Sequence, residues 1–172
     1  MKKIVGLLFI LLTFSCDDGN FEIASFEFED TVNFCGEYVL YRLSTNENRE
    51  ALIVTLTDEQ IRNDETLVLP VSITTTGTYT VTYRIFEDKV SSGYFCTTVP
   101  PVEPKVTKNW QATGGKILVI NEAIYDADEV SIIAYKHIIV IQDLVLIKGD
   151  ETIAFDPSFL YGEFQTSVPV EN

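Results

Sequence analysis

From Phe21 onward, apolar and polar residues alternate with a period of two, the pattern of β-strands that bury one face and expose the other. The clearest stretch is residues 78–86, in which polar residues separate four apolar ones, Tyr79, Val81, Tyr83 and Ile85. Similar alternation marks residues 26–29, 52–57 and 67–73, although Pro70 assigns the last of these to a sheet edge or a bulge. Residues 58–65 allow one short helical turn, which is too brief to change the fold class. The pattern therefore predicts an all-β fold.

The second half of the chain is more apolar and predicts a further series of strands. The expected strands are residues 117–120, 130–141, 144–147 and 152–155, with turns at Gly114 and Gly115 and at residues 148–151. Pro100, Pro101 and Pro104 predict a stiff, extended crossing between two halves of one domain. We therefore expect residues 21–172 to form a single antiparallel β-sandwich, immunoglobulin-like or jelly-roll-like, of about nine or ten strands.

The N-terminus has the three parts of a bacterial export signal. Lys2 and Lys3 precede a nearly unbroken apolar run over residues 4–12, and the small residue Ser15 stands directly before Cys16. This order predicts a lipoprotein signal peptide at residues 1–15, with Cys16 as the lipid-carrying first residue after cleavage. The alternatives are an ordinary secretory signal cleaved elsewhere and an N-terminal membrane helix, although the run is shorter than the about 20 residues that span a bilayer.

Lipid on Cys16 would hold the protein on a membrane. Stable anchoring takes about two acyl chains, and a lipoprotein cysteine carries three. Residues 16–20 are polar and turn-prone and predict a flexible acidic tether. Removing residues 1–15 takes away two of the 12 basic residues and none of the 26 acidic ones. A surface this acidic repels nucleic-acid phosphates, so we expect no nucleic-acid partner.

Two cysteines remain besides Cys16. In an oxidising compartment, Cys35 and Cys96 are expected to form a disulfide, which would stabilise the fold by about 4 kcal/mol in the chain-entropy model. The alternative is a pair of buried free thiols. Zinc is disfavoured because it takes about four ligands and the chain has one histidine.

Neither the single histidine nor the single tryptophan predicts a catalytic or binding site. His137 is in phase with Ile139 and Ile141, which predicts a packed or partly exposed structural histidine in place of a catalytic base. Trp110 shares a strand face with Val106 and Ala112, which favours core packing over a sugar-stacking platform. No cofactor is implied by any motif.

Acidic residues suggest two further hypotheses. Asp126, Asp128 and Glu129 are the best metal candidates, because calcium takes several carboxylate and carbonyl oxygens from one loop; the alternative is a solvated hairpin loop. The second hypothesis is a hydrolase that uses two carboxylates across a cleft. No pair among the 26 acidic residues stands out for that role.

Four stretches of the chain resemble a family of uncharacterised lipoproteins from Bacteroidota, of the flavobacterial type. They are residues 16–18, residues 34–41, residues 93–96 with the prolines that follow, and residues 135–140 with 161–164. The resemblance implies no activity, cofactor or catalytic residue. It does imply cell-surface display, because acidic residues such as Asp17 and Asp18 after the lipidated cysteine resemble the export signal of that lineage. In enterobacteria an aspartate there favours retention at the inner membrane, so a periplasm-facing membrane is the alternative.

The expected function is that of a lipid-anchored outer-membrane protein with a non-enzymatic interaction or accessory role. Its partner would be a glycan, an outer-membrane protein or another envelope component. The alternatives are a carboxylate-based hydrolase and a calcium-stabilised glycan-binding module.

Overall fold

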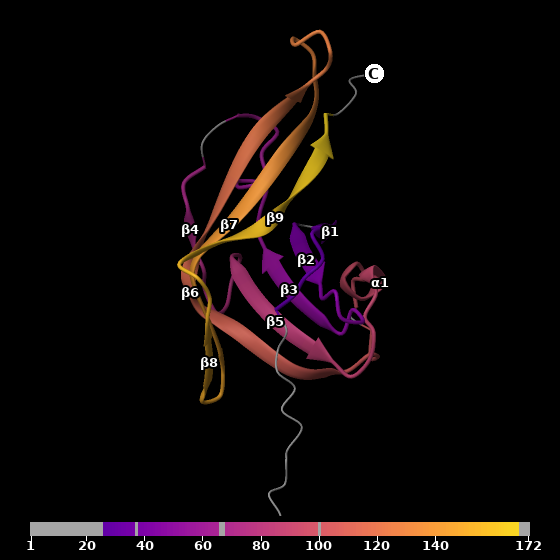
Figure 1. The fold of residues 1–172 in the computed structure, drawn as a ribbon, viewed down its shortest axis with the longest axis vertical. Coiled ribbons are helices and arrows are strands. Elements are labelled where there is room, and N and C mark those ends of the chain that lie inside the picture. Colours follow the sequence, from indigo (N-terminus) through magenta and orange to yellow (C-terminus); the bar gives the residue numbers. More distant parts are fainter. Residues whose placement is uncertain (1–25, 37, 66–67, 100, 169–172) are drawn as a thin grey trace, which may run out of the picture.

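A computed structural model describes residues 26–36, 38–65, 68–99 and 101–168 of the chain (Figure 1). The predicted signal peptide at 1–15, the predicted lipid attachment at Cys16 and the tether at 16–20 lie outside the described residues. Pro100 of the predicted crossing also lies outside them.

The described part contains nine strands and one short helix. They are β1 (Asn33–Cys35), β2 (Val39–Leu43), β3 (Glu50–Thr55), β4 (Val71–Ser72), β5 (Thr80–Phe86), α1 (Ser92–Phe95), β6 (Val106–Tyr125), β7 (Ile132–Lys148), β8 (Glu151–Ala154) and β9 (Ser158–Ser167). The prediction of an all-β fold is confirmed. No helix in these residues is long and apolar enough to cross a membrane.

All nine strands belong to one antiparallel sheet, in the order β1-β2-β3-β5-β6-β7-β8, with β4 beside β6 and β9 beside β7. These pairings do not confirm the predicted division into two packed sheets. β6 and β7 are each long enough to pair with different strands along different parts of their length. The first part of β7 pairs with β9 and its last part pairs with β8, and the hairpin of β6 and β7 rises past the body of the molecule (Figure 1).

Bulges explain why β6 and β7 are each continuous where the sequence predicts two shorter strands. The register of β6 against β7 shifts on both sides of Gly114. Gly115 has φ +116°, and a Cβ on it would lie 2.7 Å from the carbonyl oxygen of Gln142. Opposite it, Asp143 has φ +51°. Because a bulge bends a strand without ending it, the sheet folds over at this point while its hydrogen bonding continues.

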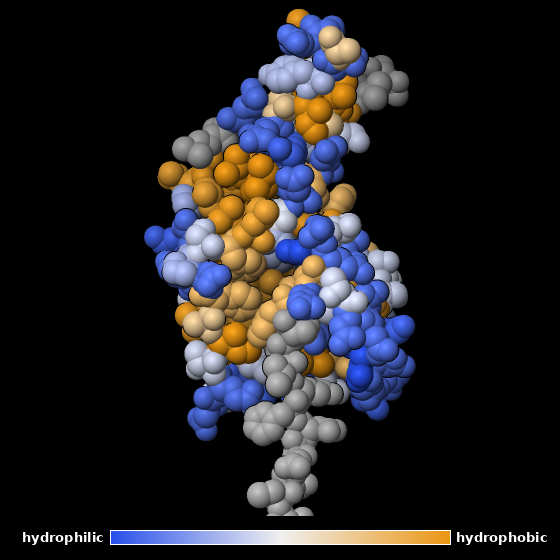
Figure 2. Space-filling model, in the orientation of Figure 1, coloured by the Kyte–Doolittle hydropathy of each residue, from blue (hydrophilic) through white to orange (hydrophobic). Residues whose placement is uncertain are grey.

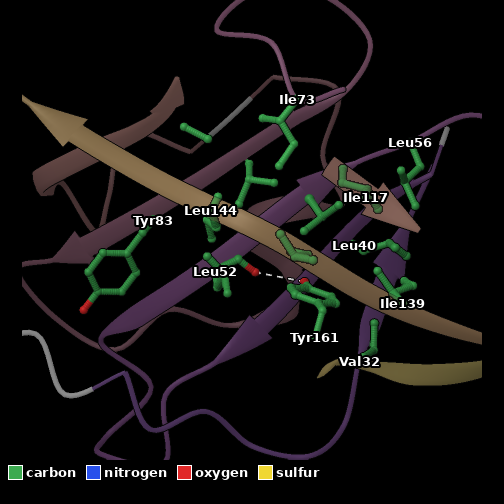
Figure 3. Close-up of a cluster of buried hydrophobic side chains, with 14 of the residues drawn as sticks. Val32, Leu40, Leu52, Leu56, Ile73, Tyr83, Ile117, Ile139, Leu144 and Tyr161 are labelled. Carbon is green, nitrogen blue, oxygen red and sulfur yellow. Dashed lines mark hydrogen bonds between the residues drawn. The ribbon is translucent and has the colours of Figure 1, made fainter. Parts of the chain in front are cut away.

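Folding over places the inner faces of β2, β3 and β5 against those of β7 and β9, with one core between them (Figure 3). Leu52 of β3 and Ile139 of β7 are both fully buried in this core. Tyr161 of β9 reaches across it, and its hydroxyl donates to the carbonyl oxygen of Leu52 at 3.0 Å. Burial raises the pKa of the Tyr161 hydroxyl. The predicted inward alternation of β5 is confirmed, because Val81, Tyr83 and Ile85 all lie in this core.

A second, smaller core lies on the outer face of β1, β2, β3 and β5. Tyr41, Ile53 and Phe86 are buried there under the segment that contains α1. The predicted disulfide is present, and Cys35 of β1 and Cys96 after α1 have their Cα atoms 5.0 Å apart. This bond therefore fastens the α1 segment to the outer face of the sheet.

The two far edges of the folded sheet meet at a seam, which we define as the line between residues 28–32 and β9. One isolated bridge joins Thr31 to Glu163 across it. Arg42, whose side chain is 13% exposed, donates from Nε to the carbonyl oxygen of Glu29 at 2.7 Å. Its Nη1 donates to the carbonyl oxygen of Tyr161, and its Nη2 donates to that of Phe28 at 3.3 Å. One guanidinium thus joins β2, the chain before β1, and β9.

Replacing Arg42 with methionine should lower the free energy of unfolding by about 3 kcal/mol, because three carbonyl oxygens lose a charged donor. Urea titration of the variant and the parent protein measures this loss. The matched control is Arg62→Met, since Arg62 is exposed and bonds, within the described part of the chain, to Asp64 alone. That change should cost at most about 1 kcal/mol. Equal losses in the two variants would contradict the role given to Arg42.

Candidate functional site

The outer face of β3 and β5 carries a hollow of about 240 Å³, which we call the outer hollow. Nine described residues line it: Val39, Ile53, Thr55, Thr80, Thr82, Arg84, Tyr94, Phe95 and Thr97. Strand alternation places the β3 and β5 members, because residues two apart on a strand share a face. Val39 of β2, the aromatic residues of α1 and Thr97 provide the remaining wall.

Several polar groups in the outer hollow have no partner among the described residues. The guanidinium of Arg84 donates from Nε to Oδ1 of Asn109 at 2.9 Å, and its two terminal nitrogens make no further bond there. The hydroxyls of Thr82 and Tyr94 are likewise without a partner in the described chain. The Thr80 hydroxyl donates to Oγ1 of Thr55 at 3.2 Å. The hollow therefore presents more donors than the fold itself uses.

Aromatic rings form one wall of the outer hollow and are held in place by their own packing. Phe95 stacks on Tyr41 with ring centroids 4.2 Å apart, and Tyr94 meets Phe86 edge-on at 5.1 Å. The disulfide at Cys96 directly follows these two aromatics in the chain. The wall is therefore pre-formed before any ligand arrives.

Sequence reasoning identified residues 78–86 as a half-buried strand with a polar outer face but did not identify this site. The hollow needs residues 94–97 folded over that face, and no periodicity in the sequence shows such a contact. One available signal was that the outward residues Thr80, Thr82 and Arg84 include no acid in a chain with 26 acidic residues.

Two further hollows lie along the seam and are more open. One, of about 560 Å³, is lined by four phenylalanines, Phe26, Phe28, Phe155 and Phe159. Polar residues and Leu160 complete its lining. The other, of about 590 Å³, lies beside the Thr31–Glu163 bridge. On the face drawn in Figure 2, apolar side chains gather over and beside β7 and β9. Arg42 lines both hollows, but its three nitrogens already bond to backbone carbonyls.

His137 is buried within a side-chain network, which is the packed one of the two placements that its strand phase allows. Its Nδ1 lies 2.6 Å from Oδ1 of Asn121, whose Nδ2 donates to the carbonyl oxygen of Gln60 at 3.1 Å. Nε2 lies 2.8 Å from the hydroxyl of Thr166. Because the amide oxygen of Asn121 faces the ring, Nδ1 carries the proton in the neutral histidine. Burial lowers the pKa of His137 to about 4.

Thr166, His137 and Asn121 lie in the order of a nucleophile, a base and a residue that orients the base. The Thr166 hydroxyl, however, donates its one proton to Oδ1 of Asn63 at 2.6 Å and not to His137. No part of the His137 side chain is exposed, so a substrate has no access to it. The lowered pKa also makes the imidazole a weak base near neutral pH. The network therefore acts as a polar element of the packing between β6, β7 and β9.

The acidic loop between β6 and β7 uses Asp128 to hold its own shape. The Asp128 carboxylate accepts from the Ser131 hydroxyl at 2.6 Å and from the backbone N–H groups of Ser131 and Val130 at 2.8 and 2.9 Å. These bonds, the hydroxyl first, lower the pKa of Asp128 to about 2. No group of three His, Cys, Asp or Glu residues in the described ranges could hold a metal ion. Calcium binding by Asp126, Asp128 and Glu129 gains no support here and stays a prediction.

The remaining candidates, Trp110 and a pair of carboxylates, do not form a binding or catalytic site in the three hollows. Trp110 is buried and packs on Tyr83 at 5.3 Å, which confirms core packing. The carboxyl groups of Glu87 and Glu103 are in hydrogen-bonding contact, which lowers the pKa of Glu87. Both are exposed, and neither lines any of the three hollows described above. They therefore do not form the two sides of a hydrolytic cleft.

Replacing His137 with glutamine should reduce the dependence of stability on pH between about 7.5 and 5. The folded pKa is about 4 and the ordinary value is 6.5, so the unfolded chain binds the proton more readily. The contribution of His137 is therefore complete above pH 6.5, declines as the pH falls, and levels off below pH 4. Over this interval the parent protein should lose about 2 kcal/mol more than His137→Gln in urea titrations. Identical pH slopes would contradict the sealed environment of His137.

Comparisons with protein-family models, with curated proteins and with solved structures find no match to this chain.

Proposed function

We propose that this protein is a lipid-anchored lipoprotein of the cell envelope whose β domain binds an envelope glycan without catalysing a reaction on it. The observation that carries the binding role is the outer hollow, a pre-formed recess lined by threonine hydroxyls, a guanidinium and two aromatic rings. Such a mixture of aromatic rings and directed polar groups is typical of small-molecule sites.

The anchoring half of the proposal is supported by the N-terminal sequence. A basic start, an apolar run and Ser15 before Cys16 together make a lipoprotein signal, and Asp17 and Asp18 favour the outer surface of the outer membrane. Membrane attachment through Cys16 and a glycan partner at the domain are thus parts of one hypothesis. The finer assignment of the fold to an immunoglobulin-like or jelly-roll-like sandwich remains a prediction beside it.

The lipid anchor predicts that Cys16→Ala abolishes labelling of the expressed full chain with radioactive palmitate, because the thiol is the site of acylation. The matched control is the double variant Cys35→Ala/Cys96→Ala, which should keep the label. Label on Cys16→Ala, or a mass spectrum of the native protein with residues 1–15 attached, would contradict the anchor.

The binding role predicts retention of the detergent-solubilised full chain on a glycan array, with the signal reduced by Thr82→Val, which removes a hydroxyl of the outer hollow at constant shape. The control Thr113→Val alters an exposed threonine outside that hollow and should not change the signal. Absence of binding to every glycan, together with turnover of any of them, would replace the proposal with an enzymatic role.

A further inference from the structure

The outer hollow is free of acidic residues in a strongly acidic protein. The chain carries 26 acidic and 12 basic residues, yet the nine described residues of the lining include one arginine and no carboxylate. The seam hollows differ, because Asp30 and Glu163 line one of them and Glu27 and Asp156 line the other. The outer hollow is therefore the place, among these three, where a negatively charged group meets a cation without a competing acid.

Arg84 is oriented to receive such a group. Its Nε bond to Oδ1 of Asn109, on the neighbouring strand β6, uses one edge of the guanidinium and fixes its plane. The two terminal nitrogens remain without a partner in the described chain. Two parallel N–H donors on a planar fork match the two oxygens of a carboxylate, and such charge-assisted pairs are among the strongest hydrogen bonds in proteins.

The rest of the lining matches a sugar ring. Hydroxyls both donate and accept, so the unpartnered hydroxyls of Thr82 and Tyr94 suit the hydroxyl groups of a saccharide. Because Thr80 donates to Thr55, the proton of the Thr55 hydroxyl is left to donate into the hollow. The rings of Tyr94 and Phe95 offer an apolar surface to the C–H groups of the sugar. A volume of about 240 Å³ suits one monosaccharide unit.

We propose that the outer hollow binds a glycan through one carboxylated sugar, a uronic acid residue, whose carboxylate is held by the two terminal nitrogens of Arg84. This inference rests on the proposed glycan-binding function and names the chemistry of its ligand. Asn109 is a positioning residue, since it acts through Arg84. The net charge of −14 repels a long polyanion, so the preferred glycan has a single acidic sugar with neutral neighbours.

The test compares two ligands that differ only in the carboxylate. The full chain in detergent micelles is titrated with methyl β-glucuronide and with methyl β-glucoside, and binding is followed by NMR. We expect the glucuronide to bind the parent protein at least about tenfold more tightly, because a charge-assisted fork is lost with the glucoside. Arg84→Gln should bring both ligands to the same affinity, and Asn109→Ala should weaken the glucuronide selectively. The control Arg62→Gln should leave both affinities unchanged.

Each other outcome identifies what has failed. Equal affinities in the parent protein, or full selectivity in a folded Arg84→Gln variant, would overturn the role of Arg84 while leaving glycan binding intact. Acetate or a peptide C-terminus that competes as strongly as the glucuronide would overturn the sugar in favour of a bare carboxylate. If the glucuronide does not bind but the protein still binds neutral glycans on an array, the uronic acid inference is overturned and the proposed glycan binding stands. No binding of any glycan ends the proposed function as well. Circular dichroism and urea titration confirm that each variant is folded.

Discussion

The guanidinium of Arg42 joins the two far edges of a single sheet that has folded over on itself. Bulges around Gly115 and Asp143 allow β6 and β7 to bend while their hydrogen bonding continues, which brings β9 back toward β2. At that seam the backbone of β9 and that of the chain before β1 share only an isolated bridge, so carbonyl oxygens there need another donor. Arg42 makes two such bonds to the chain before β1 and one to β9. These carbonyl dipoles and the carboxylate of Asp30, 3.9 Å from Nη2, balance its partly buried charge.

This closure decides which surface is left for a ligand. The inner face is filled by one continuous core, and Tyr161 spans it to reach the backbone of β3. His137, a polar residue that enters this interior, is hydrogen-bonded and buried. The proposed recognition therefore uses the outer face, where the α1 segment, fastened by Cys35 and Cys96, forms a wall beside the threonines of β5. The disulfide thus supports the site as well as the fold.

Period-two alternation was enough to predict the all-β fold class and the direction in which strand side chains point. Phase alone predicted core packing for Trp110 and a packed or partly exposed structural position for His137, and both are buried. Continuity could not be predicted, because glycines at 114 and 115 have the same signature in a hairpin turn as in a bulge. Nor does alternation decide pairing: Phe26 and Phe28 alternate with acids, yet only an isolated bridge forms there. The outer hollow depends on a contact between β5 and residues 94–97, which local pattern does not encode.

The central claim is that recognition occurs on the outer face of the folded sheet and not at its seam. Backbone amide chemical shifts of the full chain, recorded with increasing methyl β-glucuronide, test it directly. The predicted result is a set of saturable shifts confined to β3, β5 and the α1 segment, with Arg84 and Tyr94 among the largest. Shifts centred on Phe28, Arg42 and Leu160, with the outer face unchanged, would contradict it.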